Sequence, residues 1–129
     1  MTQLSLERPG NHHHVRSVSS EGVRIGEQMF NGSLLLSPQT IDTWPPLCLT
    51  DISDEHWDQV LSLEPDVVLL GTGVQQQFLP PAQLAALYRA GIGIEQMTTE
   101  AACRTFNVLA AEERRVVAAL LPIRAIRAG

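Results

Sequence analysis

Apolar segments separated by turn-forming residues divide this chain into predicted strands and helices. Near its start, residues 15–19 and 23–25 are β-prone and flank a Ser-Glu-Gly turn at 20–22, so we expect an N-terminal β-hairpin. A third extended stretch spans residues 29–36 and is closed by a Ser-Pro pair. Residues 47–49, which follow two prolines, could form another short strand.

The middle of the chain carries the strongest pattern, a strand, a helix and a second strand in succession. Residues 67–70 form an uninterrupted apolar run, as expected of a central strand covered on both faces. Two prolines then start a predicted helix over residues 81–90, and a short strand over 92–97 follows. We therefore expect a βαβ unit with parallel strands and a right-handed crossover. An earlier helix is predicted between Ser53, a good N-cap, and Pro65.

The last third of the chain begins with a helix, but its end is ambiguous. Thr98 or Thr99 can cap this helix, and apolar residues around Phe106 recur with helical spacing. Residues 110–115 have strong helix propensity, whereas the apolar run at 116–121 would equally make a buried strand. The residues alone leave both alternatives open.

These elements fit one domain. Residues 1–13 are polar and precede any periodic pattern, so we expect a flexible N-terminus there. The alternation of strands and helices afterwards predicts a single α/β domain over residues 14–129. No internal repeat or low-complexity tract suggests a second domain.

Charge and composition exclude several classes of partner. The 129 residues contain no lysine, and nine arginines are spread along a chain of formal net charge −5, so we expect no nucleic-acid binding. No segment approaches the ~20 apolar residues that span a bilayer, so we expect no membrane insertion. The N-terminus has neither secretory nor transit character, which favours the cytoplasm of a bacterium. Cys48 and Cys103 show no disulfide or zinc spacing, and we expect both to be reduced and buried.

A glycine loop gives the first candidate site. It follows the predicted central strand, at the sheet edge where open α/β folds bind ligands, and its glycines would let an anion approach the backbone. The next helix could present free amides at the same edge. The loop lacks a complete dinucleotide or Walker motif, so a plain tight turn is the competing interpretation. A binding or enzymatic site for an anionic small molecule would comprise Gly71, Thr72, Gly73, Thr99, Asn107 and Arg114.

The other reactive residue types do not indicate catalysis. His12, His13 and His14 are consecutive, and side chains of an extended segment alternate between faces, so at most two could share a metal ion. We expect no metal, no cofactor and no catalytic residue, and the sequence leans toward a protein that is not an enzyme. A carboxylate cluster around one helix start is typical of a solvated face that complements the helix dipole; it comprises Asp51, Asp54, Glu55 and Asp58.

An aromatic residue in an irregular loop gives the second candidate site. Trp44 precedes two prolines, which exclude helix there, and a tryptophan in such a loop can be an exposed contact of a protein interface. A polar run at residues 75–77 ends in Phe78, which offers a further aromatic contact. The predicted interface is Trp44, Pro45 and Phe78, and burial in the core is the competing interpretation for the indole.

Several short motifs follow one another in a particular order along the chain. They are Trp-Pro at 44–45, Leu-Leu-Gly-Thr-Gly at 69–73, Gly-Ile-Gly-Ile-Glu at 91–95 and Met-Thr-Thr-Glu-Ala-Ala-Cys-Arg-Thr-Phe-Asn-Val-Leu at 97–109, followed by Glu112, Arg114 and the tail at 116–122. In this order the chain resembles a small α/β family of unknown biochemical activity that includes the mitochondrial assembly factor three of respiratory NADH:ubiquinone oxidoreductase.

That resemblance implies both a fold and a role. It implies a three-layer α/β domain with a central mixed sheet, in which residues 114–121 form a late strand antiparallel to its neighbours. It also implies a noncatalytic protein-binding or assembly module for a multisubunit complex, which could be respiratory, and therefore a protein partner. The chain could also form a homodimer.

Overall fold

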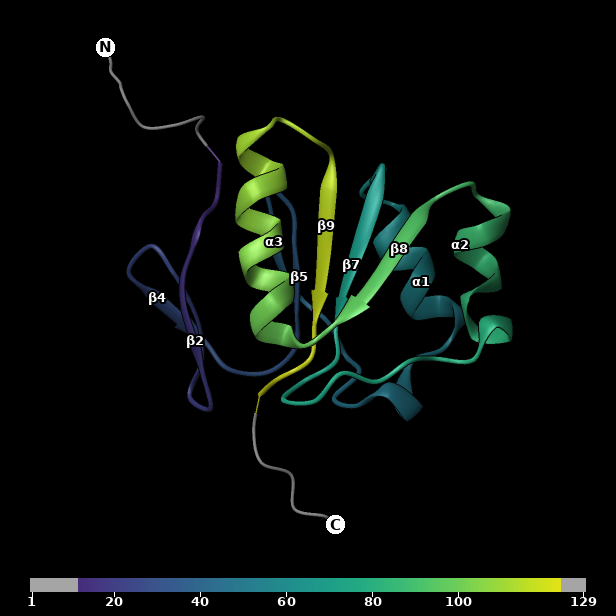
Figure 1. The fold of residues 1–129 in the computed structure, drawn as a ribbon, viewed down its shortest axis with the longest axis horizontal. Helices are drawn as coiled ribbons and strands as arrows, with labels where there is room; N and C mark the ends of the chain where they lie inside the picture. The colour runs from purple at the N-terminus through teal and green to yellow at the C-terminus, as the bar shows by residue number, and fades with distance from the viewer. Residues whose placement is uncertain (1–11, 124–129) are drawn as a thin grey trace.

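A mixed sheet of five strands forms the centre of the computed structural model, which describes residues 12–123 (Figure 1). The strand order is β6-β5-β9-β7-β8, in which β7 is parallel to both β8 and β9, and β5 is antiparallel to β9 and β6. The predicted α/β class with a mixed sheet is confirmed. The strands are β5 (Leu34–Leu36), β6 (Ile41–Thr43), β7 (Val67–Gly71), β8 (Gly93–Met97) and β9 (Val116–Leu120).

Helices cover both faces of this sheet. On one face lie α1 (Asp54–Leu61) and α2 (Ala85–Arg89), and on the other lies α3 (Thr99–Ala111) (Figure 1). A 3-10 turn, η2 (Pro81–Leu84), leads directly into α2. No helix among residues 12–123 combines the length and the apolar character needed to cross a bilayer.

Strand β9 shows how one buried segment supplies two cores. All five of its residues are buried, yet successive side chains point to opposite faces. Val116 and Leu120 pack in the cluster that contains Phe106 of α3, whereas Val117 packs in the cluster that contains Trp57 of α1. Period-two packing therefore gives the three-layer arrangement, and it explains why residues 116–120 are apolar throughout.

The orientation of β9 corrects one expectation. The strand is antiparallel to β5, as the resemblance implied, but it is parallel to β7, with Val67 opposite Val116. The reason is that α3 carries the chain back across the sheet, so the strand after it runs in the same direction as the strand before it. The same geometry makes β7, α2 and β8 the predicted parallel βαβ unit, which is confirmed.

A smaller sheet of three strands lies beside α3, over the face of the central sheet that α3 covers (Figure 1). Its strands β2 (Val15–Ser19) and β3 (Gly22–Ile25) form the predicted hairpin, which is confirmed, and β4 (Gln28–Phe30) continues it. The extended stretch predicted at 29–36 divides between β4 and β5. Gly32, at φ 107°, allows the turn between the two sheets.

Two local predictions differ from the structure. Residues 47–49 are not a strand, because a 3-10 turn, η1 (Leu49–Asp51), begins within them. The Leu47 amide donates to the Asp51 carboxylate at 3.1 Å, which closes the segment into a turn. Most of the predicted flexible N-terminus lies outside the described residues; of its last two, His13 donates its amide to the Pro38 carbonyl at 2.9 Å.

Candidate functional site at the carboxyl ends of the parallel strands

The three parallel strands β7, β8 and β9 end at the same edge of the sheet (Figure 1). From this edge the chain continues into the loop at 72–80, the start of α3, and residues 121–122. Ligands and partners of open α/β sheets bind outside such carboxyl ends, where loops rather than regular elements form the surface. The predicted glycine loop lies here.

Close contact between Gly71 and Thr99 fixes this edge. A Cβ atom on Gly71 would lie 2.9 Å from the Thr99 Cα, so only glycine allows the start of α3 to approach β7 this closely. The Thr99 side chain is fully buried; its hydroxyl donates to the Leu121 carbonyl at 2.6 Å and accepts from the Gly73 amide at 2.9 Å. One threonine thus joins the ends of β7, β9 and α3.

The loop after Gly71 is also held by internal hydrogen bonds. Thr72 is buried, and its amide donates to the Met97 carbonyl at 2.8 Å. Its hydroxyl donates to the Gln75 carbonyl at 2.7 Å and accepts from the Gln77 amide at 3.2 Å. These bonds order the loop from within, so its outward side chains are presented on a fixed backbone.

The six residues predicted to bind an anion do not converge. Gly71, Thr72, Gly73 and Thr99 come together, but the Thr72 and Gly73 amides donate to protein oxygens, and the Thr99 amide donates to the Gly73 carbonyl at 3.0 Å. The amides of these three predicted residues are therefore already bonded within the protein.

The other two predicted ligand residues lie elsewhere. Asn107 bonds Val15 of the small sheet, at 2.8 and 3.0 Å. Arg114 follows the far end of α3 and lines a separate hollow of about 670 Å³ with residues of the β5–β6 turn. The grouping of these two with the glycine loop is corrected, because the whole length of α3 separates Arg114 from Thr99.

A hollow of about 460 Å³ opens beside the glycine loop. Its walls come from three segments far apart in the sequence: the residues leading into η1, the loop after β7, and the end of β9. The lining combines apolar side chains with neutral polar groups, and no arginine of residues 12–123 belongs to it. We call it the strand-end hollow; it is lined by Leu47, Cys48, Leu49, Thr72, Gly73, Val74, Gln75, Gln77, Leu121 and Pro122.

Large apolar side chains are exposed around this hollow. Leu47 is 62% exposed, Val74 64% and Phe78 66%. Leu47 and Val74 line the hollow, and Phe78 is the neighbour of Gln77, which also lines it. We call these three residues the strand-end patch. Of the predicted interface residues, Phe78 directly follows the lining residue Gln77 in the chain and Pro45 lies two residues before Leu47; both are exposed.

Trp44, the third predicted interface residue, lies in the core. Its side chain is 2% exposed, its ring centroid lies 5.8 Å from that of Trp57, and its Nε1 donates to the His56 carbonyl at 3.4 Å. The prediction of an exposed indole is corrected. The sequence could not show this, because the loop turns the indole toward α1, which lies later in the chain.

Carboxylates gather where η1 meets α1. The Leu47 amide, which donates to Asp51, holds the pKa of that carboxyl below its ordinary value of 3.8. Asp54 and Glu55 occupy the first turn of α1 and are exposed. The Ser53 amide donates to the His56 Nδ1 at 2.9 Å, so this histidine caps the helix. This acidic, solvated segment, which we call the rim, joins the strand-end hollow at Asp51, whose carboxylate is bonded to the lining residue Leu47.

The two cysteines differ in environment. Cys103 is buried in α3, and burial raises the pKa of its thiol to about 12, so it stays protonated and unreactive at neutral pH. Cys48 is exposed, which corrects the expectation that both are buried. Its Sγ lies 3.2 Å from the Thr50 hydroxyl.

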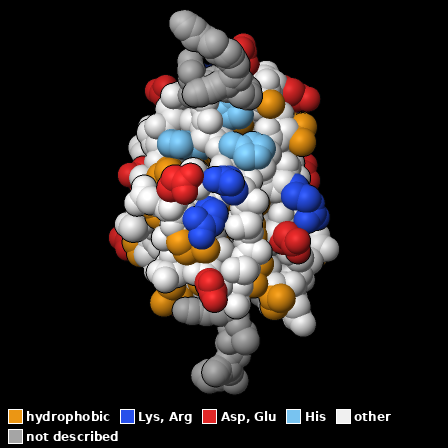
Figure 2. All heavy atoms as spheres, turned by 90° about the vertical axis from the view of Figure 1, so that its left-hand side faces the viewer, with side chains coloured by type: hydrophobic (Ala, Val, Ile, Leu, Met, Phe, Trp, Pro, Cys, Tyr) orange, Lys and Arg blue, Asp and Glu red, His pale blue; other side chains and the backbone are white. Residues whose placement is uncertain are grey.

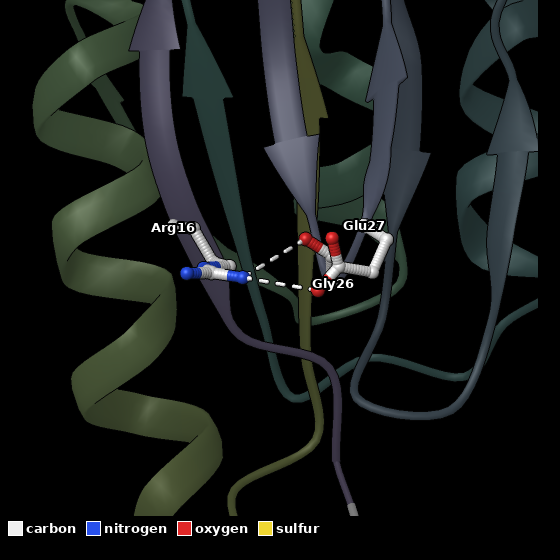
Figure 3. A network of polar contacts seen from close by, with 3 residues as sticks. All are labelled: Arg16, Gly26 and Glu27. Carbon is white, nitrogen blue, oxygen red and sulfur yellow. Dashed lines mark hydrogen bonds and ion pairs between the residues drawn. The ribbon is translucent and has the colours of Figure 1, made fainter.

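Histidine, arginine and acidic side chains are interspersed on the face that carries the small sheet (Figure 2). His12 and His13 use ring nitrogens on backbone carbonyls, at 2.9 and 3.3 Å. Arg16 donates to the Gly26 carbonyl at 3.4 Å and pairs with Glu27 at 3.6 Å (Figure 3). Both side chains of that pair are largely exposed, so it contributes little stability. Within residues 12–123, no three histidine, cysteine or acidic side chains group to hold a metal ion.

The sequence indicated the loop after the central strand but missed the other two walls of the strand-end hollow, residues 47–49 and 121–122. Leu47, Val74 and Leu121 are brought together only by the fold. One signal was present: Leu47 and Val74 are bulky apolar residues at positions between elements, directly after Pro-Pro and Gly-Thr-Gly. Apolar residues in loops either pack inward or mark a contact surface, and the sequence does not distinguish the two outcomes.

Comparison with known proteins identifies a family and several relatives of this chain. Residues 15–121 match a protein family described as "Protein of unknown function (DUF498/DUF598)". The Mus musculus protein named NADH dehydrogenase (ubiquinone) 1 alpha subcomplex assembly factor 3 is 38% identical over 112 residues, 84% of this chain and 60% of that protein. This chain therefore spans about three fifths of the mouse protein's length.

Bacterial relatives share the fold. A crystal structure of a Bordetella parapertussis protein has a TM-score of 0.82 at 36% identity, covering 88% of this chain and 98% of that one. The protein of Francisella tularensis named 13 kDa major membrane protein is 32% identical over 97 residues, 73% of this chain and 76% of that protein. The resemblance inferred from the motif order is confirmed.

Proposed function

This chain belongs to the DUF498/DUF598 family of proteins of unknown function, and we propose that it is a noncatalytic protein-binding module that assists the assembly of a multisubunit complex. The observation that carries the proposal is the strand-end patch, three large apolar side chains exposed on two segments that internal hydrogen bonds hold. A relative named as an assembly factor supports the same role. A respiratory complex is the first candidate for the assembled enzyme.

Exposed apolar side chains on ordered loops are suited to protein contact. Burying them in a partner removes apolar surface from water at roughly 25 cal/mol per Å². The backbone behind Val74 is already held by the Thr72 bonds, so little ordering entropy is lost on binding. Leu47 is similarly held by the carboxylate of Asp51. The patch is therefore pre-organised for a partner.

A small-molecule site, the alternative, receives less support from the same edge. An anionic ligand needs a cation or free amides. Arginine is absent from the lining within residues 12–123, and the amides of Thr72, Gly73 and Gln77 donate to protein oxygens. If a small molecule binds at the strand-end hollow, the geometry favours a neutral one.

The proposal is tested by cross-linking and affinity capture of the native protein from its own cell extract. The doubly substituted Leu47→Ser/Val74→Ser protein should lose specific partners, because it removes the apolar contact without touching the core. The matched control is Val108→Ser, on α3, whose side chain is similarly exposed at 55%. Partners that are retained equally by all three proteins would contradict the patch as the interface.

Location and oligomeric state are part of the same proposal. We place the protein in the cytoplasm, acting without membrane insertion or nucleic-acid contact. Cell fractionation tests this placement, and a relative named as a membrane protein makes the membrane fraction the informative comparison. Sedimentation of the purified chain tests the homodimer, which should depend on Leu47 and Val74 if the patch mediates it.

A further inference from the structure

We propose that the strand-end hollow receives a bulky apolar side chain from a partner segment in which arginine or lysine residues flank that side chain. This inference rests on the proposed function and specifies the chemistry of the partner. It follows from the apolar side chains that line the hollow and from the acidic rim, which joins the hollow at Asp51.

The lining selects an apolar occupant. Leucine, valine and proline side chains form much of the wall, and Thr72 directs its hydroxyl to the Gln75 carbonyl rather than to a ligand. The remaining polar lining groups are neutral. A charged side chain in this hollow would lose hydration without gaining an opposite charge, so an apolar one is favoured. A volume of about 460 Å³ accommodates a large aliphatic or aromatic side chain with part of its backbone.

The acidic rim favours positively charged residues on either side of the partner's apolar side chain. Asp51 ends η1, which begins with the lining residue Leu49, and its carboxylate is held against the amide of Leu47, another lining residue. Asp54 and Glu55 follow in the first turn of α1. The ion pairs among residues 12–123 join Arg16 to Glu27, Arg104 to Glu100 and Arg115 to Asp66, so they use none of these three carboxylates.

Charge complementarity therefore points to a basic partner segment. Opposite charges arranged around an apolar contact accelerate association and exclude wrong partners. An acidic segment would meet three carboxylates of like charge. The outer parts of the same rim are solvated, so the electrostatic preference should weaken as salt increases.

The test uses short fluorescein-labelled peptides with one central phenylalanine, flanked by arginine, by glutamine or by glutamate. Fluorescence polarisation with the full chain should show the arginine peptide binding at least about threefold more tightly than the glutamine peptide at low salt, with the glutamate peptide weakest. Replacing the central phenylalanine by serine should abolish binding.

Two sets of variants separate the apolar and electrostatic contributions. The triple variant Asp51→Asn/Asp54→Asn/Glu55→Gln should bind the three peptides equally, because asparagine at 51 still offers an oxygen to the Leu47 amide. Leu47→Ser/Val74→Ser should lose all peptides, whereas Val108→Ser should bind like the parent. Far-UV circular dichroism checks that each variant is folded.

The outcomes distinguish this inference from the function it rests on. If Leu47 and Val74 are needed for capture of cellular partners but the peptides show no charge preference or no binding, the inference is wrong and the proposed function stands. If neither capture nor peptide binding depends on the patch, both are wrong. If the peptides bind only to the Arg124→Gln/Arg127→Gln variant, the hollow is assigned to the chain's own C-terminal residues. If the chain dimerises and the dimer depends on the patch, the hollow is assigned to a second copy. Either result overturns the inference.

Discussion

The side-chain amide of Asn107 bonds both backbone polar groups of Val15. Its Oδ1 accepts from the Val15 amide at 2.8 Å, and its Nδ2 donates to the Val15 carbonyl at 3.0 Å. The pairing of β2 with β3 is irregular between Val15 and Ser17. A helix side chain thus takes the place of a neighbouring strand and joins the small sheet to α3.

Asn107→Ala should lower the free energy of unfolding by about 2 kcal/mol, because it leaves a buried donor and acceptor of Val15 without partners. Urea denaturation measures the change. Asn107→Asp keeps the acceptor and loses the donor, so it should fall between alanine and the parent at neutral pH. Equal stability of all three proteins would show that water replaces the side chain at no cost.

Gly71→Ala should destabilise the protein by about 1–3 kcal/mol, because the new Cβ would overlap backbone at the start of α3, which cannot move aside as a flexible side chain could. The matched control is Gly93→Ala in β8, where a Cβ would meet nothing within 4 Å. Thermal unfolding of the two variants should show a large decrease only at position 71. A similar melting temperature for both would contradict the tight contact with Thr99.

Glu113→Gly should stabilise the protein by about 0.5–1 kcal/mol. Glu113 follows α3 with φ 64°, a left-handed conformation that glycine adopts without the strain of a Cβ atom. The control is its neighbour Glu112→Gly, at φ −89°, which should be destabilising because it only adds freedom to the unfolded chain. Chemical denaturation of both variants should therefore give changes of opposite sign.

Cys103 should make stability fall at high pH. Its pKa is raised from 9.0 to about 12 in the folded protein, so between these values the unfolded chain loses a proton that the folded chain keeps. Stability is fully present below pH 9.0 and should decline by about 1.4 kcal/mol per pH unit above it, toward pH 12.

The measurement is denaturation across this pH range in the parent and in Cys103→Ala, which should lack that part of the slope. Thiol labelling of the native protein gives an independent check, since exposed Cys48 should react and Cys103 should not. Equal slopes in the two proteins would mean that Cys103 ionises as freely in the folded as in the unfolded state.

Local signals in the sequence determined the hairpin at β2–β3, the buried strand β7 and the parallel βαβ unit. Each depends on turn chemistry or on apolar runs that act over a few neighbouring residues. Residues 116–120 were ambiguous by periodicity, because a strand buried on both faces and a buried helix have the same apolar composition. There the family resemblance identified the strand, and the fold set its direction.

Tertiary structure alone decided the candidate site. Whether Trp44 is exposed depends on where α1 packs, and whether Leu47 lies beside Val74 depends on how η1 meets the ends of β7 and β9. The glycine loop was correctly located by the sequence, but its amides turned inward because Thr99 approached it from a distant segment. Short-range patterns specify elements, whereas a surface depends on which elements bury one another, and that depends on contacts between residues far apart in the chain.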